Sequence, residues 1–369
     1  MRTRDTVLEY QKVLDDAGTL SKDLDIVDPV SALDIEVEAT NGSLGNKSNY
    51  LSDVITKIEI VDGSEVLYSC NLAQLQALQF FKTGKAPVMF YSEHASGAQR
   101  GNVRLLFGRH LWDTDYAFNG KAFRNPQIKI TSNLAAVRAV SATDAFTTGS
   151  LLLSIAAKVM EGQTPPGQYL MTKEINSWTS GTSGDKRVEL PTDKAWRMLL
   201  LRYWLQGQDC DTACSNLKLT ADADKYVMLN RTTKQLDAEA YAQFGGIVWQ
   251  HNIYRCNAAT VRTVLTKEPR VLPVTLQISP YRFFGIPYAW NAQYALRVYD
   301  NTPTPVTTDE DIWTLQEGHQ LHSVIPVVFG KLDDPASWFD PTGYGKIEAV
   351  LSEAAATAAS VCLEQVRPS

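Results

Sequence analysis

The sequence has no excess of positive charge. Its 35 lysine and arginine residues are outnumbered by 41 aspartate and glutamate residues, which leaves a formal net charge of −6. Proteins that wrap nucleic acid present a strongly basic surface to the phosphates. We therefore expect no specific nucleic-acid partner and a mildly acidic surface that favours solubility.

Long apolar runs are also missing. No stretch approaches the roughly 18–20 apolar residues that cross a bilayer as a helix. The charged residues 1–5 lead into no apolar signal core, so we expect no export by a cleaved signal. Cysteine is scarce and odd in number, which favours reduced, mostly buried thiols and synthesis in a cytoplasm. The five positions are Cys70, Cys210, Cys214, Cys256 and Cys362.

The motifs of common enzymes are absent as well. The sequence contains no Gly-x-Ser-x-Gly, no Walker-type phosphate loop and no dinucleotide fingerprint, and we expect the glycine-flanked stretch 97–101 to be a loop. His319 and His322 stand three residues apart, but no carboxylate or cysteine completes a metal site at ligand spacing. Cys210 and Cys214 are half of a zinc motif without a second half. We predict no catalytic, cofactor-binding or metal-binding residues, and no enzyme.

Two kinds of residue leave alternatives open. Clustered carboxylates suit calcium, yet solvated loops are the simpler expectation. The acidic positions concerned are 308–311, Asp209, Asp211, Asp222 and Asp224. The eight tryptophans could stack on sugars, although core packing is the preferred interpretation. Because paired carboxylates for glycoside hydrolysis arise from tertiary structure, a carbohydrate-binding or glycan-cleaving double β-sandwich stays an alternative.

What the sequence does contain is a globular composition and enough chain for two domains. Of 369 residues, 44% are hydrophobic and 21% are charged, which is typical of folded proteins, and the length exceeds that of an ordinary single core. Near the start, Val7, Tyr10 and Leu14 stand at helical spacing, with Gly18 as a stop. We predict an N-terminal helical arm over residues 1–30.

Strand signals begin at residue 31. Leu33, Ile35 and Val37 alternate with acidic residues, as in a half-buried strand. Asp62 precedes a glycine between two apolar runs, which is a strong hairpin signal. Asn71 is suited to cap the helix predicted after the second run. Many short strands with frequent turns favour antiparallel sandwiches.

The chain repeats one series of elements twice, which predicts a tandem duplication of one β-rich domain. Each copy has a strand, a turn, a strand and a helix, followed by a Phe-Gly-basic strand end, a tryptophan loop and two further strands. The recurring pairs are 58–81 and 217–244, 103–109 and 325–331, the loops of Trp112 and Trp338, 127–131 and 346–351, and 151–159 and 360–366. The apolar stretch 196–205 mirrors 33–37. Proline, glycine and serine between the copies predict a linker over 166–187.

This order of elements resembles the double jelly-roll major capsid proteins of icosahedral double-stranded DNA viruses, the lineage of tectiviruses, corticoviruses and adenoviruses. The pieces that carry the resemblance are 58–81, 103–131, 217–244 and 338–366. The resemblance implies an all-β fold of two tandem jelly-roll sandwiches with a short helix in each. We expect the first jelly roll over 31–165 and the second over 188–369, with inserted loops around 247–320.

The same resemblance implies a structural protein of the virion capsid. Three copies would form a homotrimer of pseudo-hexagonal outline with six jelly rolls, which tiles an icosahedral shell. The implied partners are further copies of the chain, penton and minor capsid proteins, and an internal viral membrane. The N-terminal arm would contact that membrane through Arg2 and Arg4, each of which contributes about 1 kcal/mol at an anionic surface. The family carries no catalytic residues.

Overall fold

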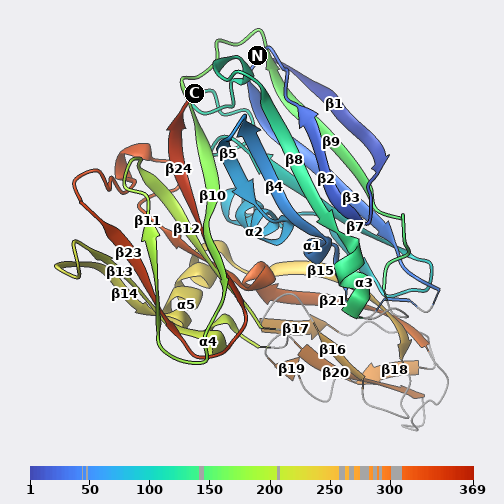
Figure 1. Ribbon diagram of the computed structural model, residues 1–369. Coiled ribbons are helices and arrows are strands. Elements are labelled where there is room, and N and C mark those ends of the chain that lie inside the picture. The colour runs from blue at the N-terminus through green and yellow to red at the C-terminus, as the bar shows by residue number, and fades with distance from the viewer. Residues whose placement is uncertain are drawn as a thin grey trace.

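The computed structural model describes residues 1–43, 45–46, 49–140, 145–205, 208–256, 262–265, 270–274, 282–285, 289–290, 293–300 and 310–369. The chain forms two β-sandwiches that stand side by side, with both termini at the same end of the molecule (Figure 1). Side chains that alternate along the strands fill the two cores, as for Leu33, Ile35 and Val37, which are all buried.

The first sandwich has two facing sheets. The strands of one sheet are, in spatial order, β1 (Arg2–Val13), β9 (Leu152–Glu161), β3 (Val30–Thr40), β7 (Ala98–Leu106) and β6 (Met89–Ser92). The strands of the other are β2 (Ala17–Asp23), β8 (Pro126–Asn133), β4 (Ile55–Asp62) and β5 (Glu65–Cys70). The hairpin predicted at Asp62 joins β4 to β5, where Gly63 takes a positive φ of 59° that suits glycine.

The second sandwich repeats this arrangement. The strands of one sheet are β10 (Gln168–Thr179), β24 (Ala358–Pro368), β12 (Trp196–Trp204) and β22 (Val324–Val328). The strands of the other are β11 (Asp185–Leu190), β23 (Ile347–Glu353), β13 (Cys214–Ala221) and β14 (Tyr226–Thr232). In chain order, β1, β2, β3, β4, β5, β7, β8 and β9 correspond one to one with β10, β11, β12, β13, β14, β22, β23 and β24.

Backbone hydrogen bonds confirm the predicted duplication residue by residue. The amide of Phe107 donates to the carbonyl of Ser31, and the amide of Phe329 donates to the carbonyl of Arg197. These equivalent bonds align β7 with β22 and β3 with β12 at one register. The structure is therefore an all-β double sandwich in which one eight-stranded unit occurs twice.

Two helices of the first sandwich, α1 and α2, have the positions that α4 and α5 have in the second. The α-helices are α1 (Leu51–Val54), α2 (Leu72–Thr83), α3 (Leu134–Val140), α4 (Cys210–Ala213) and α5 (Thr233–Phe244), and the short 3₁₀ turns are η1 (Gly120–Ala122), η2 (Leu321–Ser323) and η3 (Pro335–Ser337). As predicted, Asn71 caps α2, and its side chain accepts from the amide of Gln74 while Gln74 accepts from the amide of Asn71. Thr232 and Gln235 make the same capping box in α5.

The predicted helical arm over 1–30 is wrong. Residues in this segment form β1 and β2, which pair with β9 and β8, and Leu14, Leu24 and Ile26 are buried in the first core. β1 is an edge strand with one open side, so its apolar residues do not follow the strict alternation of an internal strand. Its partner β9 lies more than a hundred residues away in the sequence, which no local pattern reveals.

The predicted linker over 166–187 is wrong for the same reason. It contains β10 and the start of β11, which are the equivalents of β1 and β2 and pair with β24 and β23. Both errors therefore concern the first two strands of a sandwich, which lie in different sheets. The glycine-flanked stretch 97–101, expected to be a loop, mostly belongs to β7, where Gln99 and Arg100 pair with β3.

Residues 247–320 lie between α5 and β22 and contain strands as well as connections. These strands are β15 (Ile247–Cys256), β16 (Arg262–Leu265), β17 (Arg270–Val274), β18 (Arg282–Gly285), β19 (Ala289–Trp290), β20 (Gln293–Asp300) and β21 (Glu310–His319). β15 runs parallel to β6, so the insertion of the second half extends a sheet of the first sandwich through β15, β21 and β17. It lies at the end of the molecule opposite the termini (Figure 1).

Candidate functional site

The two sandwiches meet at a junction formed by β5 and α2 of the first and by β10, β12 and β24 of the second. β5 runs parallel to β10, with Ser69 paired to Lys173. α2 lies between the sandwiches (Figure 1), and nine of its residues are buried. The side-chain amide of Gln74 donates across the junction to Glu174 at 2.5 Å and to Ser360 at 2.9 Å. We call this contact the inter-sandwich junction.

A buried ion cluster of Lys82, Arg197 and Glu364 lies in the inter-sandwich junction. Lys82 Nζ is 2.6 Å from Glu364 Oε1, and Arg197 Nη1 is 2.5 Å from Glu364 Oε2. All three side chains are at most 1% exposed. Lys82 also donates to the carbonyl of Leu106, and Arg197 donates to the carbonyl of Leu332. Because an isolated buried ion costs several kcal/mol, the cluster holds only when both sandwiches are docked.

The cluster contains two cations and one anion, and this imbalance shifts the pKa values of Lys82 and Glu364. Burial lowers the pKa of Lys82, and Arg197 lowers it further against the attraction of Glu364, so that the pKa is about 8. Burial raises the pKa of Glu364, but the two cations outweigh this effect, and its pKa lies below the ordinary range. Glu364 is therefore ionised at neutral pH, and Lys82 is the group that titrates near it.

We expect the stability of the protein to rise between pH 8 and pH 10.5 through Lys82. In this window the unfolded chain still holds the lysine proton, which the folded chain has lost, since the pKa of about 8 lies below the ordinary 10.5. The gain should reach about 3 kcal/mol, at about 1.4 kcal/mol per pH unit. Urea unfolding at pH 7.5 and pH 10.5, at one protein concentration, measures it.

Lys82→Met is the matched variant for this measurement, because it removes the titrating group and keeps a flexible apolar chain. All other titrations cancel in the difference between the two proteins. Equal pH dependence in the wild type and Lys82→Met would mean that Lys82 stays charged throughout the window.

A smaller aromatic cluster closes the junction beside the ion cluster. Tyr116 of the first sandwich packs on Trp338 of the second, with ring centroids 5.9 Å apart, and Leu170 is buried beside them. The guanidinium of Arg197 lies 5.8 Å from the ring centroid of Trp338, within cation–π range. The tryptophan loop identified in the second sequence repeat thus packs against the first sandwich and stabilises the junction.

The histidine pair predicted as an incomplete metal site serves two separate contacts. His319 Nε2 lies 3.1 Å from Asp237 of α5, whereas buried His322 lies 2.7 Å from Gln76 of α2. No group of three or more potential metal-ligating histidine, cysteine or acidic side chains occurs among the described residues. His322 therefore belongs to the inter-sandwich junction.

The cysteines and acidic clusters have structural surroundings. The four cysteines whose side chains are described are free and buried, while the side chain of Cys256 lies outside the described part of the chain. Burial raises the pKa values of Cys210 and Cys214, the latter to about 11. Asp222 accepts from the amides of Gly345 and Lys346. Ion pairs link Asp224 to Lys218 and Arg187 and link Asp211 to Lys234, while Asp209 precedes α4. The acidic stretch at 308–311 lies partly outside the described residues, and its side chains lie wholly outside them.

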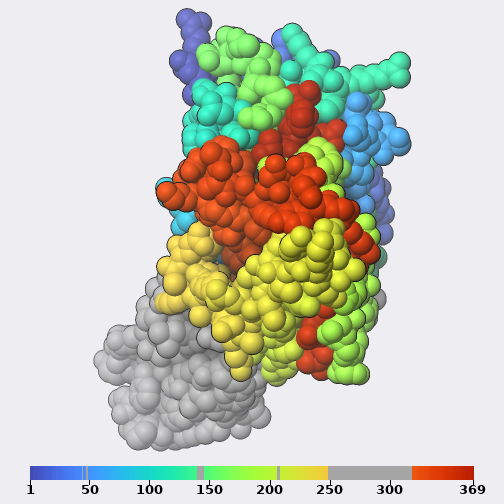
Figure 2. Space-filling model, turned by 90° about the vertical axis from the view of Figure 1, so that its left-hand side faces the viewer, coloured from blue at the N-terminus to red at the C-terminus, as the bar shows by residue number. Residues whose placement is uncertain are grey.

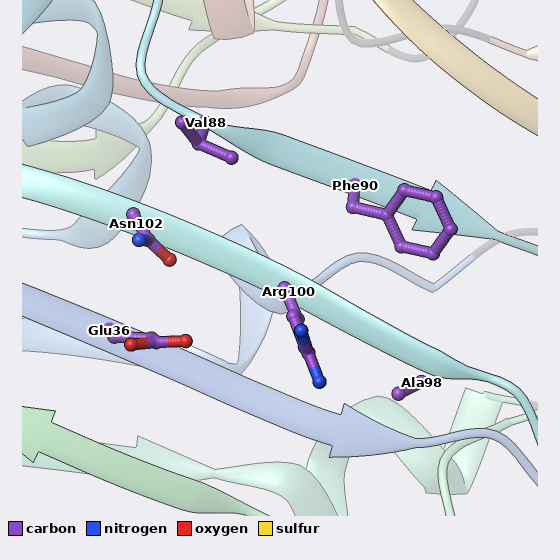
Figure 3. A pocket seen from close by; sticks show the side chains of 6 residues that line it. All are labelled: Glu36, Val88, Phe90, Ala98, Arg100 and Asn102. Atoms are coloured by element: carbon purple, nitrogen blue, oxygen red, sulfur yellow. The ribbon is translucent and has the colours of Figure 1, made fainter.

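The tryptophans and the surface grooves bear on the carbohydrate alternative. Of the tryptophans whose side chains are described, Trp196 and Trp338 are buried, and Trp112, Trp178 and Trp204 are half-buried. An open groove of about 490 Å³ runs over β3, β7 and the start of β6 (Figure 3), and Glu36 is the one carboxylate among its described lining residues. Hydrolysis of a glycoside needs a pair of carboxylates, which the described lining of this groove does not supply, whereas a second groove of about 460 Å³ is lined by Glu174, Glu189 and Asp193.

No sequence motif pointed to Lys82, Arg197 and Glu364. A usable signal existed nonetheless, because Arg197 and Glu364 interrupt apolar strands at positions that alternation assigns to buried or central surfaces. A charge in such a position needs a buried partner. The partner itself could not be named from the sequence, since 282 residues separate Lys82 from Glu364.

Two equivalent eight-stranded sandwiches, each with a capped helix and joined by a buried junction, define a double jelly-roll protein. Comparisons with known proteins agree on the fold. No family model matches the chain, and no curated protein matches it. A crystal structure of the STIV major capsid protein matches with a TM-score of 0.56 at 10% identity and covers 99% of this chain and 96% of its own.

Two further solved structures show the same likeness. The major capsid protein of bacteriophage PM2 matches with a TM-score of 0.53 at 10% identity and covers 100% of this chain and 98% of its own. A chain of the PBCV-1 virus capsid matches with a TM-score of 0.56 at 9% identity and covers 99% and 93%. The chain therefore has the fold of double jelly-roll major capsid proteins over its whole length.

Proposed function

We propose that this chain is a viral major capsid protein, located in the virion capsid, that works by self-association. The observation that carries the proposal is the repeat of a complete eight-stranded unit within one chain, strand for strand. Three such chains supply six similar units, so that a trimer presents a pseudo-hexagonal outline that tiles an icosahedral facet. The likeness to capsid proteins over the whole chain supports the same conclusion.

The inter-sandwich junction suits this role. A subunit of a shell must hold its two units at one angle, because errors of orientation would accumulate over a facet. Buried charges that are satisfied only in the docked state favour one arrangement over its neighbours. We assign no catalytic activity to the chain, and the buried ion cluster serves its shape.

The predicted partners are other copies of the chain, penton proteins, minor capsid proteins and an internal viral membrane, with synthesis in the host cytoplasm. The predicted membrane contact depends on a helical N-terminal arm. Residues of that segment form β1 and β2 instead, so the membrane contact has no structural basis in this chain. None of the described helices is long and apolar enough to span a bilayer. Self-association is the partner property that the duplicated fold supports best.

The first experiment is a solution mass. Light scattering on the purified protein at micromolar concentration and moderate salt should give three times 40.9 kDa, a mass that persists on dilution because trimer interfaces in closed assemblies bury large areas. Particles seen by electron microscopy would extend the result to the shell. A stable monomer would contradict the proposal and would direct attention to a screen for glycan binding and hydrolysis.

A further inference from the structure

The duplication leaves two strands without the partners that their equivalents have. Within the chain, β5 of the first sandwich lies beside β10 of the second. β14 is the equivalent of β5 and ends its sheet, and β1 is the equivalent of β10 and also ends its sheet. The two open edges lie on opposite sides of the molecule (Figure 1). β14 therefore corresponds to the β5 side of the inter-sandwich junction, and β1 corresponds to its β10 side.

The equivalent helices α2 and α5 also differ in how much of their surface is covered. α2 and α5 have the same length and the same capping box, yet nine residues of α2 are buried and only Thr233, Leu236 and Asp237 of α5 are. The second sandwich covers the outer side of α2, and no described element covers the corresponding side of α5. β14 and α5, which are yellow in Figure 2, form an open face of the molecule.

Apolar side chains gather on both open edges. On β1, Val7 is 62% exposed and Tyr10 is 73% exposed, and on β14, Tyr226 and Val227 are 47% and 51% exposed. Unpaired edge strands with apolar side chains are templates for association, and proteins usually protect them with charge or cover. These edges therefore fit a partner that presents the complementary edge.

Each residue that pairs β5 with β10 in the inter-sandwich junction has an equivalent on one of the open edges. Thr6 on β1 holds the place of Lys173 on β10, since each lies two positions before a β-bulge in strands of matched register. Asn230 on β14 holds the place of Ser69 on β5, since each lies two positions after the bulged residue of its hairpin. Because Ser69 pairs with Lys173 inside the chain, the equivalent pair between copies is Asn230 with Thr6.

We propose that β14 and α5 of one copy dock beside β1 of the next copy, in the arrangement that β5 and α2 adopt beside β10, with Asn230 next to Thr6. The inference rests on the proposed trimer and names its contact surfaces. The contact is head-to-tail, and three copies close the ring. Gln235, the equivalent of Gln74, then faces Ser154, the equivalent of Ser360, with its side-chain NH₂ available as a donor.

The buried ion cluster has no counterpart in the contact between copies. The residues at the places of Lys82, Arg197 and Glu364 are Gln243, Ser31 and Lys158. Lys158 is already paired with Asp5 and Asp34 of its own sandwich. At the place of Glu364, the contact between copies therefore lacks the anion that links the two cations within the chain.

A disulfide between copies tests the register. Neighbouring strands lie about 4.8 Å apart, which suits a disulfide, so the double variant Thr6→Cys with Asn230→Cys should form one on mild oxidation. A denaturing, non-reducing gel should show covalent dimers and trimers and nothing larger. Both positions are polar and at the surface, so the variant should fold. The wild type controls for its own cysteines.

Two further pairs of cysteine substitutions serve as controls for the cross-link. Lys12→Cys with Asn230→Cys moves the thiol about 20 Å along β1 at about 3.3 Å per residue and should not cross-link. Ser69→Cys with Lys173→Cys should form a disulfide within one chain and leave the mass unchanged. A protein that scatters as a trimer but cross-links no better at Thr6 than at Lys12 would overturn the inference and leave the trimer standing.

The remaining outcomes separate the inference from the proposed function. A monomer by light scattering, with no cross-link, overturns both. A ladder that continues beyond three chains supports the contact and overturns the closed trimer. As an independent measurement, Val7→Lys should raise the concentration at which trimers dissociate at least tenfold, whereas Val27→Lys, at an exposed valine outside the edge, should not; equal effects would overturn the inference.

Discussion

Deletion of residues 1–26 should prevent the first sandwich from folding. The deletion removes β1 and β2, exposes the edges of β9 and β8, and takes Leu14, Leu24 and Ile26 out of the core. Burial of each such side chain contributes about 1.5–3 kcal/mol, so the three together approach the total stability of a domain, about 5–15 kcal/mol. We expect insoluble protein, or a product whose first half is digested rapidly by trypsin while the second half persists.

The matched control keeps the strand and removes only its exposed apolar groups. Val7, Tyr10 and Val13, all exposed on β1, are replaced together by threonine, which favours strands. This variant should remain soluble, and its first half should resist trypsin as well as that of the wild type. If the truncated chain instead melted like the wild type, residues 1–26 would be a detachable arm, and the placement of β1 and β2 in the sheets would be incorrect.

Glu364→Gln should destabilise the protein by about 3–5 kcal/mol, the range for breaking a buried ion pair. The substitution keeps the shape of the side chain but leaves Lys82 and Arg197 buried with no anion between them. Arg197 then has no anion beside it, and Lys82 either remains a second unpaired cation or gives up its proton, since the attraction of Glu364 supports its pKa of about 8. Neither side chain reaches water while the sandwiches stay docked. Urea unfolding at pH 7 measures the loss.

Glu189→Gln is the control for this prediction. Glu189 also pairs with a lysine, Lys346, but both side chains are well exposed at 69% and 48%. Exposed pairs contribute about 0–1 kcal/mol, so this variant should unfold close to the wild type. Equal small losses for the two variants would mean that the Glu364 site admits water and that the cluster does not lock the sandwiches.

The repeated elements could be predicted because their signals are local. The Asp62 turn, the cap at Asn71 and the alternation around Ile35 each depend on a few neighbouring residues, and the structure contains the elements that they indicated. Their recurrence in the same order predicted the duplication, which the paired hydrogen bonds of Phe107 and Phe329 confirm.

The first two strands of each sandwich could not be predicted from local signals. β1 pairs with β9, and β10 pairs with β24, across most of the length of each unit. A strand whose partner is that distant is recognised only if its own alternation is strict, and edge strands with exposed apolar residues such as Val7 and Tyr10 lack it. Glycine and proline near β10 and β11 added a misleading loop signal.

The sequence by itself determined the fold class, the duplication and the order of the elements that recur, because turn chemistry and alternation act over a few residues and repeat visibly. Only the tertiary structure decided how the two units meet. Lys82, Arg197 and Glu364 become one cluster, and β1 and β14 become open edges, through contacts between segments hundreds of residues apart. Long-range packing selects those pairs by shape and by the cost of burying charge, and neither quantity is written in any local stretch of the chain.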